Sequence, residues 1–162
     1  MTNDILQNIN FKNKHLHISV DELTIVIQPN EDTIGEWPNH WNQIAKELSA
    51  IIAEKLSFSS LFGEMIREQI SPKGYTTSYS FENMPYFLRI AFHEDYFKMG
   101  IIIKFSASAL SLYQQAYENS YKEPFGIYEI IQKLNEPYWN MHLSRIDWFC
   151  CKVLNLLSNK VE

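Results

Sequence analysis

The stretch that decides the fold is Met141–Cys151, which reads M-H-L-S-R-I-D-W-F-C-C. Successive side chains of a strand point to opposite faces, so Arg145, Asp147 and Cys151 share one side. The residues on the other side are apolar or aromatic, namely Ile146, Trp148 and Cys150. An unpaired charge in such a strand would be too costly to bury. Arg145 and Asp147 therefore form either a satisfied ion pair or part of a functional site.

Three further strand patterns occupy the middle of the sequence. Apolar and aromatic residues alternate with other residues in three runs, and turn residues separate these runs. The runs are Tyr75–Phe81, Tyr86–Phe92 and Met99–Phe105. This spacing predicts three consecutive antiparallel strands. If helices cover one face of these strands, the open face carries Arg89, His93 and Lys104. We interpret that face either as a binding surface or as a partly solvated sheet face.

The remaining patterns predict a first strand and the helices. His15–Ile27 alternates with a change of phase at Asp21-Glu22, which indicates a strand with a bulge or bend. Apolar spacing of three and four predicts helices within residues 38–56, 61–66, 108–117 and 124–134. We expect an α+β fold in the order β-α-α-β-β-β-α-α-β, with a single antiparallel sheet of about five strands and helices packed on one face. A ferredoxin-like arrangement is the nearest alternative.

Length and composition indicate one globular domain. The chain has 162 residues, of which 46% are hydrophobic and 14% aromatic, and this is enough to bury a sizeable core. We expect a single domain over residues 1–162, with flexible ends at 1–14 and 155–162. The sequence has no signal-peptide pattern and no apolar run long enough to cross a bilayer. We therefore expect a cytoplasmic protein with no membrane partner.

The net charge of −5 lies entirely in the first half of the sequence. Residues 1–72 contain five basic and ten acidic residues, whereas residues 73–162 contain nine of each. This distribution does not favour strong attraction to nucleic-acid phosphates. The acidic residues form either a solvated surface or a contact for a basic partner. The candidates for such a partner contact are Glu47, Glu54, Glu64 and Glu68.

Three segments carry a family resemblance. They read S-V-D-E-L-T-I-V-I (Ser19–Ile27), K-M-G-I-I-I-K-F-S (Lys98–Ser106) and H-L-S-R-I-D-W-F-C-C (His142–Cys151). In this order and rough spacing they resemble the N-terminal part of Rep-trans type rolling-circle replication initiators and the related relaxases of conjugative elements. The late strand of that family typically reads T-R-I-D, and Arg145-Ile146-Asp147 matches its last three positions. The resemblance spans most of this chain but less than half of a typical family member.

The resemblance implies metal-assisted DNA nicking, in which carboxylates hold a divalent cation and a tyrosine attacks the scissile phosphodiester. By that resemblance Asp147 is a metal ligand. The family's second carboxylate would fall at Cys151, whose thiol is a poor ligand for magnesium or manganese, and no tyrosine follows Cys151 in the sequence. We therefore expect the initiator fold without its nicking activity. We also expect no cofactor, because a divalent metal would be needed only if nicking were retained.

Three hypotheses about function follow. The first is a mobile-element or phage protein, more an inactive relative than an enzyme, that binds DNA or a nucleic-acid-processing complex. Its nucleic-acid-binding residues would be Arg89, His93, Lys104 and Arg145. The second is an anti-CRISPR-like inhibitor of a host defence nuclease that contacts its target through the acidic surface, and the third is a nickase that uses an unrecognised tyrosine. The aromatic content also leads us to consider a homodimer.

Overall fold

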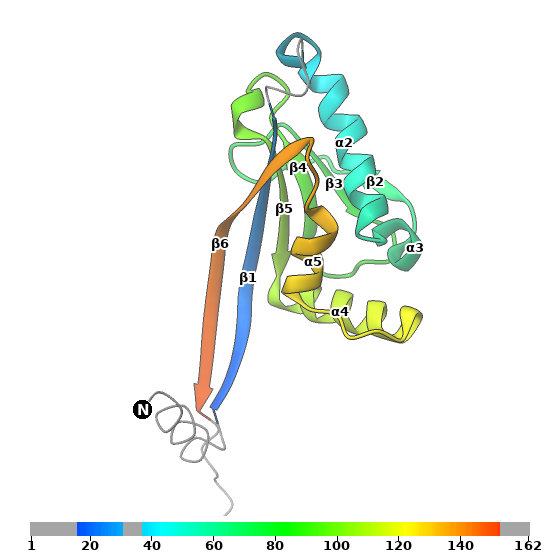
Figure 1. Cartoon of the computed structure of the whole chain (residues 1–162), viewed down its shortest axis with the longest axis vertical. Helices are drawn as coiled ribbons and strands as arrows, with labels where there is room; N and C mark the ends of the chain where they lie inside the picture. Colours follow the sequence, from blue (N-terminus) through cyan, green and yellow to red (C-terminus); the bar gives the residue numbers. More distant parts are fainter. Residues whose placement is uncertain (1–15, 31–36, 153–162) are drawn as a thin grey trace, which may run out of the picture.

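The computed structural model describes residues 16–30 and 37–152, which form one antiparallel sheet with helices packed on one face (Figure 1). The described strands are β1 (Leu16–Pro29), β2 (Met65–Arg67), β3 (Thr77–Phe81), β4 (Leu88–Phe92), β5 (Ile101–Ser106) and β6 (Trp139–Lys152). Their order across the sheet is β2-β3-β4-β5-β1-β6. The described helices are α2 (Trp41–Lys55), α3 (Phe58–Phe62), α4 (Ala107–Tyr121) and α5 (Ile127–Leu134), with short 3₁₀ turns η1 (Trp37–His40) and η2 (Phe97–Met99). The predicted α+β class is therefore confirmed.

The described sheet has six strands rather than about five, because β2 lies where the sequence pattern indicated a helix. Met65–Arg67 pairs antiparallel with β3 at one edge of the sheet. Gly63 ends α3 with a φ of +82°, a conformation that residues with a side chain rarely adopt. The chain then changes direction and enters β2. A strand of three residues is too short for its alternation to be recognised in a sequence.

Two expectations concern parts of the chain that the structure does not describe. The ends at 1–14 and 155–162, where we expected flexibility, lie outside the described residues. So do the side chains of Cys150 and Cys151, although the backbone of β6 is described through Lys152. No helix within the described residues is both long and apolar enough to cross a bilayer.

The main core lies between the sheet and the helices. Alternate residues of β1, β4 and β5 point towards the helices and are fully buried, as the predicted alternation requires: Leu23, Ile25, Ile27, Leu88, Ile90, Phe92, Ile101, Ile103 and Phe105. α2 covers them with a stripe that has the expected spacing, which includes Trp41, Ala45, Leu48 and Ile52. The other face of the sheet is left without a helix layer among the described elements (Figure 1).

Tyr113 of α4 lies at the centre of an aromatic cluster in this core. Its ring centroid is between 4.9 and 5.8 Å from the rings of Phe58, Phe105 and Phe125, and its side chain is fully buried. The hydroxyl donates a hydrogen bond of 2.7 Å to the carbonyl of Leu56, just after α2. Burial raises the pKa of the Tyr113 hydroxyl far above its ordinary value. This residue therefore ties α2, α3 and α4 to the sheet.

β1 lies between β5 and β6 and contains the predicted bulge. Val20 pairs with Trp148 and Glu22 pairs with Asp147, so Asp21 is an extra residue on β1. The part of β1 that precedes Glu22 pairs with β6 and not with β5. The two strands continue there as a two-stranded ribbon that projects beyond the rest of the sheet (Figure 1).

Candidate nucleic-acid interface

The sheet register places three of the four predicted nucleic-acid-binding residues in one row on the open face. Arg89 of β4 pairs with Lys104 of β5, and Lys104 pairs with Thr24 of β1. Thr24 in turn pairs with Arg145 of β6. Because neighbouring strands are about 4.8 Å apart, the row spans about 14 Å. We call Arg89, Lys104 and Arg145 the basic row.

Each cation of the basic row has a carboxylate partner. The Nη2 of Arg89 lies 3.3 Å from a Glu68 oxygen. The Oε1 of Glu22 lies 3.0 Å from the Nζ of Lys104 and 3.3 Å from the Nη1 of Arg145. Glu22 is therefore shared by two cations on neighbouring strands. The side chain of Arg145 is the most exposed of the basic row, at 55%.

Asp147 also pairs with the basic row. Its Oδ2 lies 2.5 Å from the Nη2 of Arg145, and this contact raises the pKa of Arg145. The sequence allowed Arg145 and Asp147 to form either an ion pair or part of a functional site, and the structure contains the ion pair. Asp147 and Glu22 face each other across β6 and β1, but both carboxylates already hold cationic side chains.

The donor set around Asp147 does not fit a divalent cation. Magnesium and manganese need several oxygen ligands, and a bound cation would have to displace the Arg145 guanidinium. Among the residues that the structure describes, no group of three or more His, Cys, Asp or Glu side chains could hold a metal ion. The assignment of Asp147 as a metal ligand thus remains one that the family resemblance alone suggests.

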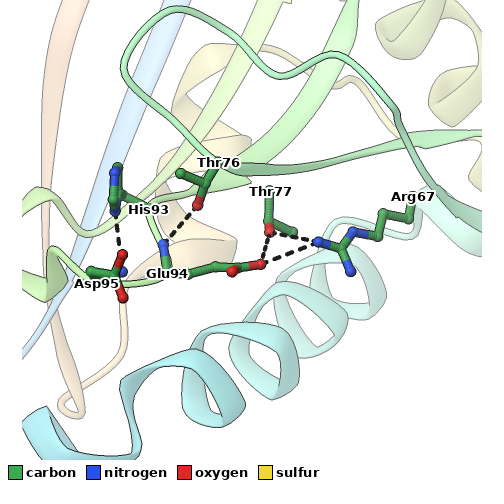
Figure 2. Close-up of polar contacts among 6 residues, drawn as sticks. All are labelled: Arg67, Thr76, Thr77, His93, Glu94 and Asp95. Carbon is green, nitrogen blue, oxygen red and sulfur yellow. Dashed lines mark hydrogen bonds and ion pairs between the residues drawn. The ribbon is translucent and has the colours of Figure 1, made fainter.

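His93, the fourth predicted residue, lies apart from the basic row. It follows β4 and is four residues from Arg89, roughly 13 Å along an extended chain. Its ring is 4.4 Å from that of Tyr96, and its Nδ1 accepts a hydrogen bond of 3.1 Å from the backbone N–H of Asp95 (Figure 2). The backbone carbonyl of His93 accepts a bond from the Trp41 indole. His93 therefore stabilises the turn after β4.

A polar cluster that the sequence did not reveal lies beside this turn (Figure 2). The Thr77 hydroxyl lies 2.5 Å from the Glu94 carboxylate, and the Arg67 guanidinium lies 3.1 Å from the same oxygen. The backbone N–H of Glu94 donates to the Thr76 hydroxyl. The hydrogen bond from Thr77 is the main cause that lowers the pKa of Glu94, and the charge of Arg67 adds to it.

Replacing Thr77 by Val should raise the pKa of Glu94 towards its ordinary value, because the hydroxyl is lost while the shape is kept. A carboxyl whose pKa is lowered by folding contributes stability above its unfolded pKa, and this contribution is lost as the pH falls through the folded pKa. The stability difference between wild type and Thr77→Val should therefore be present at pH 7 and shrink below about pH 4. An NMR titration of the Glu94 carboxyl measures the shift directly.

Thr76→Val is the matched control for that experiment. It removes the hydrogen bond to the backbone of Glu94 but leaves the carboxyl contacts in place. Its effect on the Glu94 pKa should be clearly smaller than that of Thr77→Val. Equal titration curves for wild type and Thr77→Val would contradict the assigned cause.

The four predicted partner-binding carboxylates lie on three different parts of the described chain. Glu47 and Glu54 are exposed on α2, seven residues and thus about two helical turns apart. Glu64 is exposed in the connection between α3 and β2. Glu68 pairs with Arg89 on the open face of the sheet. Of the four, Glu47 and Glu54 are the two that lie on a described helix.

The fold is that of a replication-initiator-like α+β domain, and the structural similarity that the three segments predicted is confirmed. The solved structure that supports this is a rolling-circle replication initiator protein from Geobacillus stearothermophilus, with a TM-score of 0.52 and 18% sequence identity. The match covers 82% of this chain but 43% of the initiator, so it spans less than half of the initiator's length. No protein-family model and no curated protein matches the sequence. At this identity the similarity concerns the fold.

Proposed function

We propose that this chain is a mobile-element or phage protein that binds nucleic acid through the basic row on the open sheet face and does not cut it. The observation that carries the proposal is the register, which aligns Arg89, Lys104 and Arg145 although they come from three separate strands. The replication-initiator-like fold supports it, because the similar protein is named as a rolling-circle replication initiator.

The ion pairs of the basic row determine how strong such binding can be. The ion pair between Arg145 and Asp147 is exposed, and such pairs contribute only about 0–1 kcal/mol, so a phosphate can replace Asp147 at little cost. Arg145 is the most accessible cation, whereas the Arg89 side chain is 20% exposed. The carboxylates of Glu68, Glu22 and Asp147 remain nearby and repel the phosphates. We therefore expect binding that is weak and sensitive to salt.

The proposal predicts how affinity for a labelled single-stranded oligonucleotide depends on salt. If the three cations of the basic row each neutralise one phosphate, the logarithm of the binding constant should fall with the logarithm of the salt concentration with a slope of about −2. The triple variant R89A/K104A/R145A should bind at least about tenfold more weakly and lose most of that slope. Fluorescence anisotropy measures both quantities.

A second triple variant, K46A/K73A/K98A, is the matched control. It removes the same charge from exposed lysines outside the basic row, so its affinity should stay within about threefold of wild type if general charge attraction is minor. Equal losses in both variants would show that the row has no special role. Absence of binding by wild type at low ionic strength would reject the proposal.

The lack of cutting is a separate part of the proposal. Its support is that the described residues contain no group of three or more His, Cys, Asp or Glu side chains that could hold a metal ion. Incubation of end-labelled single-stranded DNA with the protein and manganese should give no covalent adduct. An adduct on a denaturing gel would overturn the proposed lack of cutting. Binding through the basic row would still be tested separately by the dependence of affinity on salt.

An inhibitor of a host defence nuclease is the second candidate. It is favoured by the exposed carboxylates Glu47 and Glu54, which lie on one side of α2, and by the acidic first half of the chain. A pull-down of the tagged protein from its host should then recover a basic defence protein, and E47K/E54K should abolish that recovery. Recovery that is unchanged by E47K/E54K would exclude α2 as the contact.

A further inference from the structure

The outer edge of β6 is the largest unpaired edge of the described sheet. Among the described strands, β6 pairs with β1 alone and has 14 residues, whereas β2 at the opposite edge has three. A strand edge presents a row of backbone N–H and C=O groups that can pair with another strand. Proteins commonly shorten such edges, and β2 is shortened in this way. The long edge of β6 is interrupted by one extra residue, Ser144, which has no partner on β1.

We propose that β6 pairs antiparallel with β6 of a second copy of this chain, about a two-fold axis at Ile146. In such a pair, residues equally far from Ile146 on the two copies face each other. Arg145 of each copy then lies opposite Asp147 of the other copy. Directly opposed charges of opposite sign stabilise an antiparallel pair, and like charges destabilise it.

The charge pattern distinguishes this register from its neighbours. A two-fold axis at residue 145 would place the Arg145 side chains of the two copies opposite each other. An axis at residue 147 would likewise oppose the two Asp147 side chains. Only the axis at Ile146 places Arg145 and Asp147 opposite each other. The edge also carries Leu143, an apolar side chain that is 39% exposed in the single chain, and a second strand would cover part of it.

The pairing would join the two sheets into one continuous sheet. The open faces of the two copies would lie side by side, with Arg145 at the junction and Arg89 at the far end of each basic row. This inference does not depend on nucleic-acid binding, because it rests on the edge of β6 and its charges.

Charge reversal at the edge tests the proposal by analytical ultracentrifugation of the full chain. Arg145→Asp places carboxylates opposite carboxylates, and Asp147→Arg places guanidinium groups opposite guanidinium groups. Each variant alone should self-associate at least about tenfold more weakly than wild type. An equimolar mixture of the two variants should form a heterodimer, because every opposed pair is then complementary. The double variant R145D/D147R should likewise dimerise with itself.

Arg89→Asp is the matched control, because it makes the same charge change in the basic row but on β4, away from the edge. It should leave self-association unchanged. The proposal is overturned if wild type stays monomeric at about 100 μM, a concentration at which even weak interfaces associate. It is also overturned if the wild-type dimer persists in both single variants, or if the mixture gains no heterodimer.

Cross-linking provides a second readout if a single variant fails to fold. In a background with C150S and C151S, Ile146→Cys places one thiol per copy on the proposed axis, so a short bis-maleimide should give a covalent dimer. Lys73→Cys, an exposed position between β2 and β3 at the other end of the sheet, should give much less of it. Equal yields at the two positions would count against the β6 contact.

Discussion

Gly100→Ala should destabilise the protein by about 3 kcal/mol or more. Gly100 precedes β5 with φ +68° and ψ −161°, a backbone region that is essentially restricted to glycine. A Cβ at this position would lie 2.4 Å from the carbonyl oxygen of Ile27. That oxygen belongs to β1, whose Ile27 pairs with Ile101 of β5, so neither strand can move away without breaking the ladder between them. Urea denaturation measures the change in the free energy of unfolding.

Gly74→Ala is the matched control, since Gly74 also has a positive φ of +91° but has room for a Cβ. A Cβ there would meet only the tip of the Met99 side chain, at 3.8 Å. The substitution should therefore cost only the conformational preference, about 1–2 kcal/mol. If Gly74→Ala and Gly100→Ala proved equally destabilising, the close approach of β1 to Gly100 would not be the cause.

Tyr113→Ala should lower the free energy of unfolding by about 4–5 kcal/mol, the second large effect that we expect. The substitution would leave a cavity between Phe58 of α3, Phe105 of β5 and Phe125, which lies in the connection between α4 and α5. Because these rings come from separate parts of the fold, they cannot close on the cavity together. The substitution would also leave the carbonyl of Leu56 without its hydrogen bond. Many domains have a total stability of only about 5–15 kcal/mol, so this variant should be close to unfolding at 37 °C.

Two further substitutions separate the contributions at Tyr113. Tyr113→Phe keeps the ring and removes only the hydroxyl, so it should cost about 1–3 kcal/mol for the unsatisfied Leu56 carbonyl. Tyr128→Ala removes a tyrosine of α5 that is 68% exposed, and its effect should stay within about 0.5 kcal/mol. Thermal and urea denaturation of the three variants test this ranking, and a large effect of Tyr128→Ala would contradict it.

The sequence was most informative where strands follow one another along the chain. The alternation that ends at Phe81, Phe92 and Phe105 located β3, β4 and β5, and the change of phase at Asp21-Glu22 located the bulge of β1. These features depend on neighbouring residues, so they are visible in a local pattern. β2 was missed because three residues show too little alternation, and Met65 and Ile66 also suit a helix.

The candidate site could be predicted only in part, because its geometry depends on pairing between distant segments. Arg89 and Lys104 were expected on one face, since both belong to consecutive strands. The row is completed by Arg145 only because β1 lies between β5 and β6. Because β1 pairs with strands that are distant in the sequence, the sequence did not indicate that Glu22 is the shared partner of Lys104 and Arg145.

The position of β1 has a consequence for the order in which the chain folds. β2, β3, β4 and β5 are joined through short connections, whereas β1 must pair with β5 about 80 residues later and with β6 more than 100 residues later. Closing such long loops costs chain entropy before any contact forms, so β1 should enter the sheet late. Substitutions that weaken β1, such as Ile25→Val, should then accelerate unfolding more than they slow refolding. The side of the sheet that contains β1 and β6 would be the last part to assemble.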